Sequence, residues 1–154
     1  MTIRRSAAAA SAVAFGLLAL SACSQPTPLA TVTVGKGSVH TEAACYKNGN
    51  PLASDLLRSC LAKEPTHIVK VRPTDTIHFG VEPAIAKNGW LIVANSAQKT
   101  NIIKDSYRSF SGQSLFVDQM TGQSSQSVVV NVVESAGQGN GALGVWQFKM
   151  ELQS

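Results

Sequence analysis

The fold is decided by two stretches near the end of the chain, SVVVNVVE at residues 127–134 and LGVWQFKMEL at residues 143–152. Both place large apolar side chains at every second position: Val128, Val130 and Val132 in the first, and Trp146, Phe148, Met150 and Leu152 in the second. Because successive side chains of a strand point to opposite faces, this period predicts two strands that each bury one face. The glycine-rich residues 135–141 between them predict a hairpin connection.

Further short strands, separated by Gly, Pro and Asn turns, are predicted upstream of this hairpin. They lie within residues 31–34, 38–46, 67–72, 74–82, 90–94, 100–110 and 114–117. Residues 90–94 (WLIVA) are almost continuously apolar, which is typical of a strand buried on both sides. Helical periodicity is scarce: residues 52–61 fit either a short helix or an irregular loop, and residues 84–86 fit one helical turn. The chain is therefore predicted to be all-β, an immunoglobulin-like β-sandwich of about seven strands with Trp90 opposite Trp146 in its core.

The first 22 residues have the three parts of a secretory signal peptide. Arg4 and Arg5 supply the positive charge at its start. Residues 7–20 form an apolar run that is short for a membrane span, which takes roughly 20 apolar residues. We therefore expect residues 1–22 to direct export and then to be removed.

The signal segment ends in Leu20-Ser21-Ala22-Cys23, which resembles the lipobox of bacterial lipoprotein signal peptides. The resemblance implies cleavage before Cys23 and a diacylglyceryl group on its sulfur. The alternative is an ordinary signal peptide that ends near Ala22 and leaves Cys23 without a role. With the lipobox, residues 23–30 become a lipidated cysteine and a proline-containing tether, whose seven residues after Cys23 extend about 20 Å. Residues 31–154 then form a single extracytoplasmic domain, anchored to the outer face of the cell membrane.

Removing the signal segment leaves 132 residues, which suit one domain with one core. Because Arg4 and Arg5 leave with it, 11 basic residues remain against 9 acidic ones, a net charge of +2. The basic residues form no run and do not interleave with aromatic residues. The sequence therefore gives no support for nucleic-acid binding.

Cys45 and Cys60 are the two cysteines that remain once Cys23 carries a lipid. In an oxidising compartment they are predicted to form a structural disulfide. The bridge closes a loop of about 15 residues, which the chain-entropy model values at roughly 3 kcal/mol. The alternative is a metal or redox pair, but the spacing is not C-x-x-C and no His pattern accompanies it.

Several loose motifs together resemble an uncharacterised family of small actinobacterial lipoproteins. They are Cys45-Tyr46, Cys60, IHFGVE at 77–82, AIA at 84–86, WLIV at 90–93 and the valine-rich end of the chain at 127–152. Residues 119–141, rich in Gln, Ser and Gly, depart from that pattern. The family has no established activity, so the resemblance implies a fold, an anchor and a disulfide, and no catalytic residue.

Candidate metal ligands are few. Imidazole and thioether groups suit copper, and the chain offers His40, His67, His78, Met120 and Met150. A blue-copper site also needs a cysteine near the end of the chain, and no cysteine follows Cys60. We therefore expect the histidines to face solvent and keep copper or zinc handling as the alternative function.

Candidate nucleophiles and phosphate loops are equally weak. Neither SFSG at 109–112 nor SAG at 135–137 is the Gly-x-Ser-x-Gly elbow of hydrolases, and GQGNG at 137–141 lacks the Lys-Ser/Thr of a phosphate-binding loop. We expect a non-enzymatic lipoprotein, without cofactor or metal, that binds an envelope protein, a cell-wall polymer or a small ligand at the membrane. An envelope hydrolase is a third hypothesis with less support.

Overall fold

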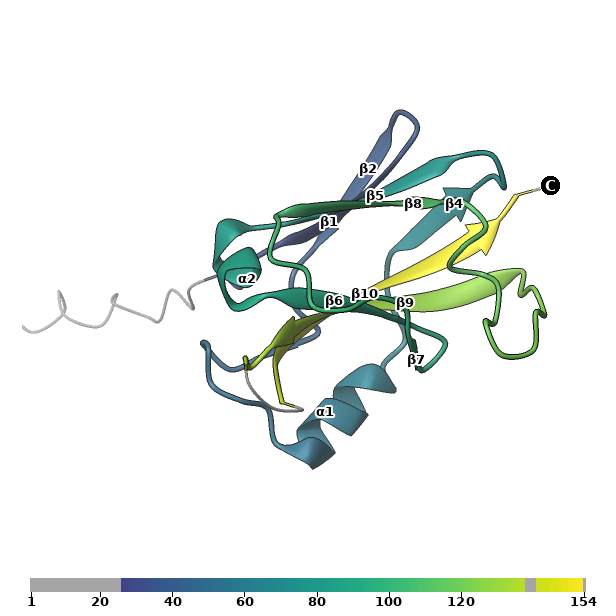
Figure 1. The fold of residues 1–154 in the computed structure, drawn as a ribbon. Coiled ribbons are helices and arrows are strands. Elements are labelled where there is room, and N and C mark those ends of the chain that lie inside the picture. Colours follow the sequence, from purple (N-terminus) through teal and green to yellow (C-terminus); the bar gives the residue numbers. More distant parts are fainter. Residues whose placement is uncertain (1–25, 138–140, 154) are drawn as a thin grey trace, which may run out of the picture.

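The computed structural model describes residues 26–137 and 141–153, and Figure 1 shows two β-sheets packed on each other. The chain is therefore an all-β sandwich, as its alternating apolar pattern predicts. The signal segment and Cys23 lie outside the described residues. Within the described residues, no helix is long and apolar enough to cross a membrane.

One sheet has four strands in the order β2-β1-β5-β8, and each pairs antiparallel with its neighbour. The strands are β1 (Ala30–Val34), β2 (Gly37–Thr41), β5 (Thr76–Val81) and β8 (Tyr107–Ser111). In β5 the predicted apolar face, Ile77, Phe79 and Val81, is buried, and the residues between them are accessible. The sheet therefore has one face in the core and one toward solvent.

The second sheet has six strands, ordered β3-β10-β9-β6-β7, with β4 also paired to β10. The strands are β3 (Cys45–Tyr46), β4 (Ile68–Val71), β6 (Trp90–Ala94), β7 (Ala97–Gln98), β9 (Ser127–Ser135) and β10 (Ala142–Leu152). The predicted hairpin of β9 and β10 is confirmed. Along its other edge β10 pairs antiparallel with β3 at its start and parallel with β4 at its end.

Trp90 and Trp146 both lie fully inside the core, but they do not face each other across it. Both belong to the six-stranded sheet, on β6 and β10, which flank β9 on its two sides. The predicted opposition of the two indoles is therefore wrong. Across the core, Phe79 of the four-stranded sheet meets Phe148 edge to face, with ring centroids 6.4 Å apart.

Two short helices complete the fold, α1 (Ser54–Leu61) and α2 (Pro83–Asn88). Of the two alternatives for residues 52–61, the structure has the helix. Helix α1 packs on the outer face of the six-stranded sheet, as Figure 1 shows. That face of β10, where Val145 and Gln147 lie, is therefore buried as well.

Two predicted strands differ from the structure. The predicted strand 38–46 is divided into β2 and β3, because the chain crosses from one sheet to the other between Thr41 and Cys45. Residues 114–117 form turns with one isolated bridge at Val117. The adjacent Leu115 and Phe116 are both buried, which an alternating strand with one buried face cannot achieve.

Two further expectations need correction. Strand β6 was expected to be buried on both sides, but its side chains alternate: Trp90, Ile92 and Ala94 are buried, and Leu91 and Val93 are half-buried. The described residues also contain ten strands where about seven were predicted. Two of the ten were not predicted as separate strands: β3, which is divided from 38–46, and the two-residue β7 at a sheet edge. A period of two residues reveals neither.

The segment before β1 is bound to the sandwich. The indole Nε1 of Trp146 donates to the carbonyl of Pro28 over 2.6 Å, and the backbone N–H of Ala43 donates to the hydroxyl of Thr27 over 3.0 Å. The N–H of Glu82 donates to the carbonyl of Leu29 over 3.1 Å. The predicted tether of residues 23–30 is therefore too long, because residues 27–29 belong to the folded domain.

Candidate functional site

The outer face of the four-stranded sheet is the clearest candidate for a binding surface. Cross-strand partners share one face of a sheet, so the strand registers define its members. They are Ser38 and His40 on β2, Thr31 and Thr33 on β1, Thr76, His78 and Gly80 on β5, and Tyr107, Ser109 and Ser111 on β8. We call these ten residues the hydroxyl face. All ten are exposed or half-exposed, and none is Asp, Glu, Lys or Arg.

A shallow hollow of about 470 Å³ crosses one end of the hydroxyl face. His40, Thr31, Gly80 and Tyr107 follow one another in a row over the four strands, because each is the register partner of the next. The hollow is lined by His40, Thr31 and Gly80. Gly80 forms its floor: a Cβ placed there would make ordinary van der Waals contacts at 3.9 and 4.0 Å, so a side chain would fit there without a clash and would occupy part of the hollow.

Tyr107 is held in place by hydrogen bonds. Its hydroxyl bonds to Nδ1 of His78, and the Ser109 hydroxyl donates to the Tyr107 oxygen over 2.9 Å. Ser109 Oγ also lies 3.0 Å from Nδ1 of His78. The rings of His78 and Tyr107 stack with an interplanar angle of 20° and centroids 5.5 Å apart. Tyr107 is nevertheless 52% exposed, so the face presents a fixed aromatic ring to solvent.

The pairing of Ser109 with His78 could be taken for a catalytic dyad. An activated serine needs a base that a third group orients and donors aimed at the developing oxyanion. The hydrogen bonds described for His78 all involve Nδ1, which also bonds Tyr107. The arrangement therefore fixes the two rings on a flat surface and does not orient the imidazole toward a reacting group.

The five candidate metal ligands lie in separate places. His40 and His78 belong to the hydroxyl face but are on β2 and β5, with β1 between them. His67 precedes β4 in the other sheet, Met150 is buried in the core, and Met120 is 97% exposed in a loop. Among residues 26–137 and 141–153, no group of three or more His, Cys, Asp or Glu side chains could hold a metal ion. The arrangement gives the copper or zinc alternative no support.

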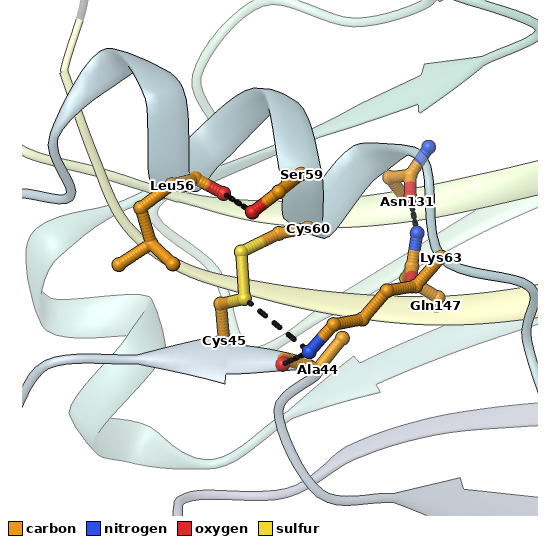
Figure 2. Close-up of a disulfide and its surroundings, with 8 residues drawn as sticks. All are labelled: Ala44, Cys45, Leu56, Ser59, Cys60, Lys63, Asn131 and Gln147. Atoms are coloured by element: carbon orange, nitrogen blue, oxygen red, sulfur yellow. Dashed lines mark hydrogen bonds between the residues drawn. A yellow bond between two sulfur atoms is a disulfide. The ribbon is translucent and has the colours of Figure 1, made fainter.

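Cys45 and Cys60 form a disulfide in the structure, with their Cα atoms 5.9 Å apart. Figure 2 shows that the bridge fastens α1 to β3 at the edge of the six-stranded sheet. Lys63, just after α1, adds a hydrogen bond of 3.2 Å from its ammonium group to the carbonyl of Ala44. The disulfide therefore stabilises the layer opposite the hydroxyl face.

Two other hollows are less suited to a ligand. One of about 650 Å³ lies between residues 99–105 and β8, but the ammonium groups of Lys99 and Lys104 donate to the carbonyls of Val117 and Asn88. These lysines therefore stabilise loops. The other, of about 250 Å³, lies between the segments that precede β3 and β4 and reaches Gln147. The Gln147 amide already donates to Asn131 over 2.9 Å.

Glu134 is an ionisable residue inside the domain that the sequence does not single out. It is buried, with Trp90 and Gly144 as its register neighbours on β6 and β10. Asn88 at the end of α2 donates to its Oε1 over 2.7 Å, whereas its Oε2 is buried without a hydrogen bond among the described residues. Burial raises the pKa of this carboxyl above its ordinary value, and the bond from Asn88 opposes the change.

Sequence reasoning placed every member of the hydroxyl face except Ser111 on a predicted strand but did not bring them together. The signal was present as polar residues with a period of two, such as Thr31 and Thr33 in β1 and Tyr107, Ser109 and Ser111 in β8. What was missing is the order of the strands, which sets β1 beside β5 and β5 beside β8.

A scan of protein-family models, a search of curated proteins and a search of solved structures found no match to this chain.

Proposed function

We propose that this protein is a lipid-anchored binding protein on the outer face of the cell membrane, and that it contacts its partner through the hydroxyl face. The observation that carries the proposal is the combination of exposed hydrogen-bonding groups with an ordered, half-exposed Tyr107 on one sheet face. Rigid aromatic side chains supply contact area at low entropic cost, and hydroxyl groups supply adaptable hydrogen bonds. The proposal is of a non-enzymatic protein without a cofactor, because the His78 cluster fixes rings and does not activate Ser109.

The anchor is proposed from the lipobox at Cys23. Thr27–Leu29 are bound to the sandwich, so only four peptide units separate Cys23 from the first bound residue, Thr27, a reach of at most about 14 Å. The end of the sandwich where β1 begins would then lie close to the membrane. The row from His40 to Tyr107 includes Thr31, the second residue of β1, and so would open near that end.

An immunoglobulin-like topology is also proposed. In that fold the second strand pairs with the fifth in one sheet, and the third, sixth and seventh strands form the other. The pairing of β5 with β8 and the run β6-β9-β10 match this scheme, and the β1–β2 hairpin would be an addition beside β5. The resemblance to small actinobacterial lipoproteins agrees with the same anchor, disulfide and fold.

Two experiments test the proposed function. Cys23→Ala should abolish labelling by a fatty-acid analogue and move the protein from the membrane fraction to the soluble fraction; full labelling of the variant would contradict the anchor. In the Cys23→Ala chain, which has no lipid to carry it into the membrane, sedimentation with purified cell envelopes should be reduced by Tyr107→Ala. Ile68→Ala on β4 is the matched control, because Ile68 is 50% exposed, close to the value for Tyr107, and lies on the other sheet. Equal sedimentation of both variants and the Cys23→Ala chain would contradict a role for the hydroxyl face.

A further inference from the structure

We infer that the ligand of the hydroxyl face is a neutral oligosaccharide chain, which lies in the row formed by His40, Thr31, Gly80 and Tyr107. The inference rests on the proposed function and names the ligand class of the same site. It follows from three properties of the face: its lack of Asp, Glu, Lys and Arg residues, its aromatic ring and its shape.

The first property is that none of the ten members of the face is Asp, Glu, Lys or Arg. Arg108 on β8 alternates with them and therefore points toward the other side of the sheet. Glu82 lines one end of the hollow, where an exposed carboxylate would repel an anionic polymer. Hydroxyl and imidazole groups both donate and accept hydrogen bonds, as the hydroxyl groups of a sugar do. The face is therefore complementary to a neutral ligand rich in hydroxyl groups.

The second property is the Tyr107 ring. Aromatic rings carry negative charge on their faces and attract the positive edges of C–H bonds, and one face of a sugar ring presents several C–H groups in a plane. The bonds from His78 and Ser109 fix the ring before a ligand arrives. Little conformational entropy is therefore lost when a sugar stacks on it.

The third property is the open floor at Gly80. Any side chain there would rise between Thr31 and Tyr107, its two register partners. The row crosses four strands, so it is about 14 Å long at a strand spacing of 4.7–4.9 Å. This length fits a short chain of linked sugars and exceeds a single ring. A peptide that added a strand at the free edge of β2 or β8 would use backbone groups at the edge and leave the floor at Gly80 unused.

The test is calorimetric titration of the full chain, in a detergent without sugar headgroups, with two neutral tetrasaccharides: one of N-acetylglucosamine and one of glucose. We expect saturable binding of at least one of them with Kd near about 1 mM, since each hydrogen bond replaces one with water. Gly80→Val should abolish the binding by filling the floor, and Tyr107→Ala should weaken it at least about tenfold.

Matched controls separate these effects from a loss of fold. Gly37→Val places the same β-branched residue elsewhere in the same sheet, where a Cβ has an ordinary contact of 3.5 Å, and Ile68→Ala removes a comparably exposed side chain. Both should leave binding unchanged. All four variants should keep the thermal midpoint of the unchanged chain within a few degrees, roughly the shift that 1 kcal/mol produces.

The outcomes distinguish this inference from the proposed function. One outcome is that neither sugar binds at a sugar concentration of about ten times the expected Kd, but Tyr107→Ala still reduces sedimentation with envelopes. The ligand class is then wrong and the binding face stands. Envelope binding that is lost after protease treatment and survives periodate oxidation of sugars would overturn the inference in favour of a protein partner. Sugar binding that survives both Gly80→Val and Tyr107→Ala would also overturn it. If sugars and envelopes both fail to bind, both proposals fail.

Discussion

Replacing Glu134 by Gln should stabilise the protein at neutral pH. The carboxyl is 1% exposed, and only one of its two oxygens has a hydrogen-bond partner, the amide of Asn88. Glutamine has nearly the same shape, and its carbonyl oxygen can still accept that bond. The substitution removes the possibility of ionisation without opening a cavity.

The magnitude follows from the burial of Oε2. A buried polar group without a partner costs about 1–3 kcal/mol, a cost that the amide nitrogen of Gln in the place of Oε2 also incurs, whereas the larger cost of a buried charge falls on ionised Glu134 alone. In the unfolded chain Glu134 titrates near 4.5, whereas burial raises its pKa in the folded state. The unfolding free energy is therefore highest, as far as Glu134 is concerned, below pH 4.5, where the carboxyl is protonated in both states. It falls as the pH rises from 4.5 to the folded-state pKa and stays at the lower value above that pKa. We expect the stability of Glu134→Gln relative to the unchanged chain to rise between pH 4 and pH 7, so that the variant is the more stable at pH 7 by on the order of 1 kcal/mol.

Urea unfolding of residues 26–154 at a series of pH values between 4 and 8 measures this difference. The midpoint should change without a change in slope. Glu151→Gln is the control with the opposite sign, because the hydrogen bond from Lys70 lowers the pKa of Glu151. Its destabilising effect should grow as the pH rises through the ordinary range of a carboxyl. A stability difference between Glu134→Gln and the unchanged chain that does not vary with pH would refute the reasoning.

Three other predictions concern stability. Replacing both Cys45 and Cys60 by Ala should lower the free energy of unfolding by about 3 kcal/mol, because the bridge spans 15 residues; urea unfolding measures this, and a loss below about 1 kcal/mol would contradict the chain-entropy account. Gly144→Ala should cost about 1–3 kcal/mol, since its Cβ would lie 2.6 Å from the ring of Trp146; an unchanged thermal midpoint would show that the ring can move. Trp146→Phe removes the indole donor to the Pro28 carbonyl and should speed proteolytic cleavage before β1. Cleavage at an unchanged rate would mean that the bond does not hold this segment.

The local elements of this fold could be predicted where one residue pattern determines them. The alternation in β5, β9 and β10 fixes which face of each strand is buried. Residues 52–61 fit a helix or a loop, and Leu52, Leu56 and Cys60 at intervals of four favour the helix only weakly, because three apolar positions barely define a helical face. Burial of the outer face of β10 was not predictable either, since it depends on the docking of α1 through the Cys45–Cys60 bridge.

The binding face could not be predicted because it depends on pairings between distant segments. His40 and Tyr107 are 67 positions apart in sequence and come into one row only through β1 and β5. A polar period of two marks the outer side of each strand separately, but any order of strands satisfies it. Gly80 is a clear case: in β5 alone it is a polar-side position without a side chain, and it becomes the floor of a hollow only between Thr31 and Tyr107.

Strand β10 completes the core and, through Trp146, also holds the segment that would connect the hydroxyl face to the membrane. Trp146 lies on β10 with its ring buried, yet its indole nitrogen bonds the Pro28 carbonyl at the start of the domain. Rotation of the sandwich about the segment before β1 would break this bond and those of Thr27 and Leu29. With a lipid on Cys23, the domain would therefore be held at a short distance from the membrane. Close to the membrane, a thin chain of linked sugars could then reach the row from His40 to Tyr107 more easily than a bulky folded partner could.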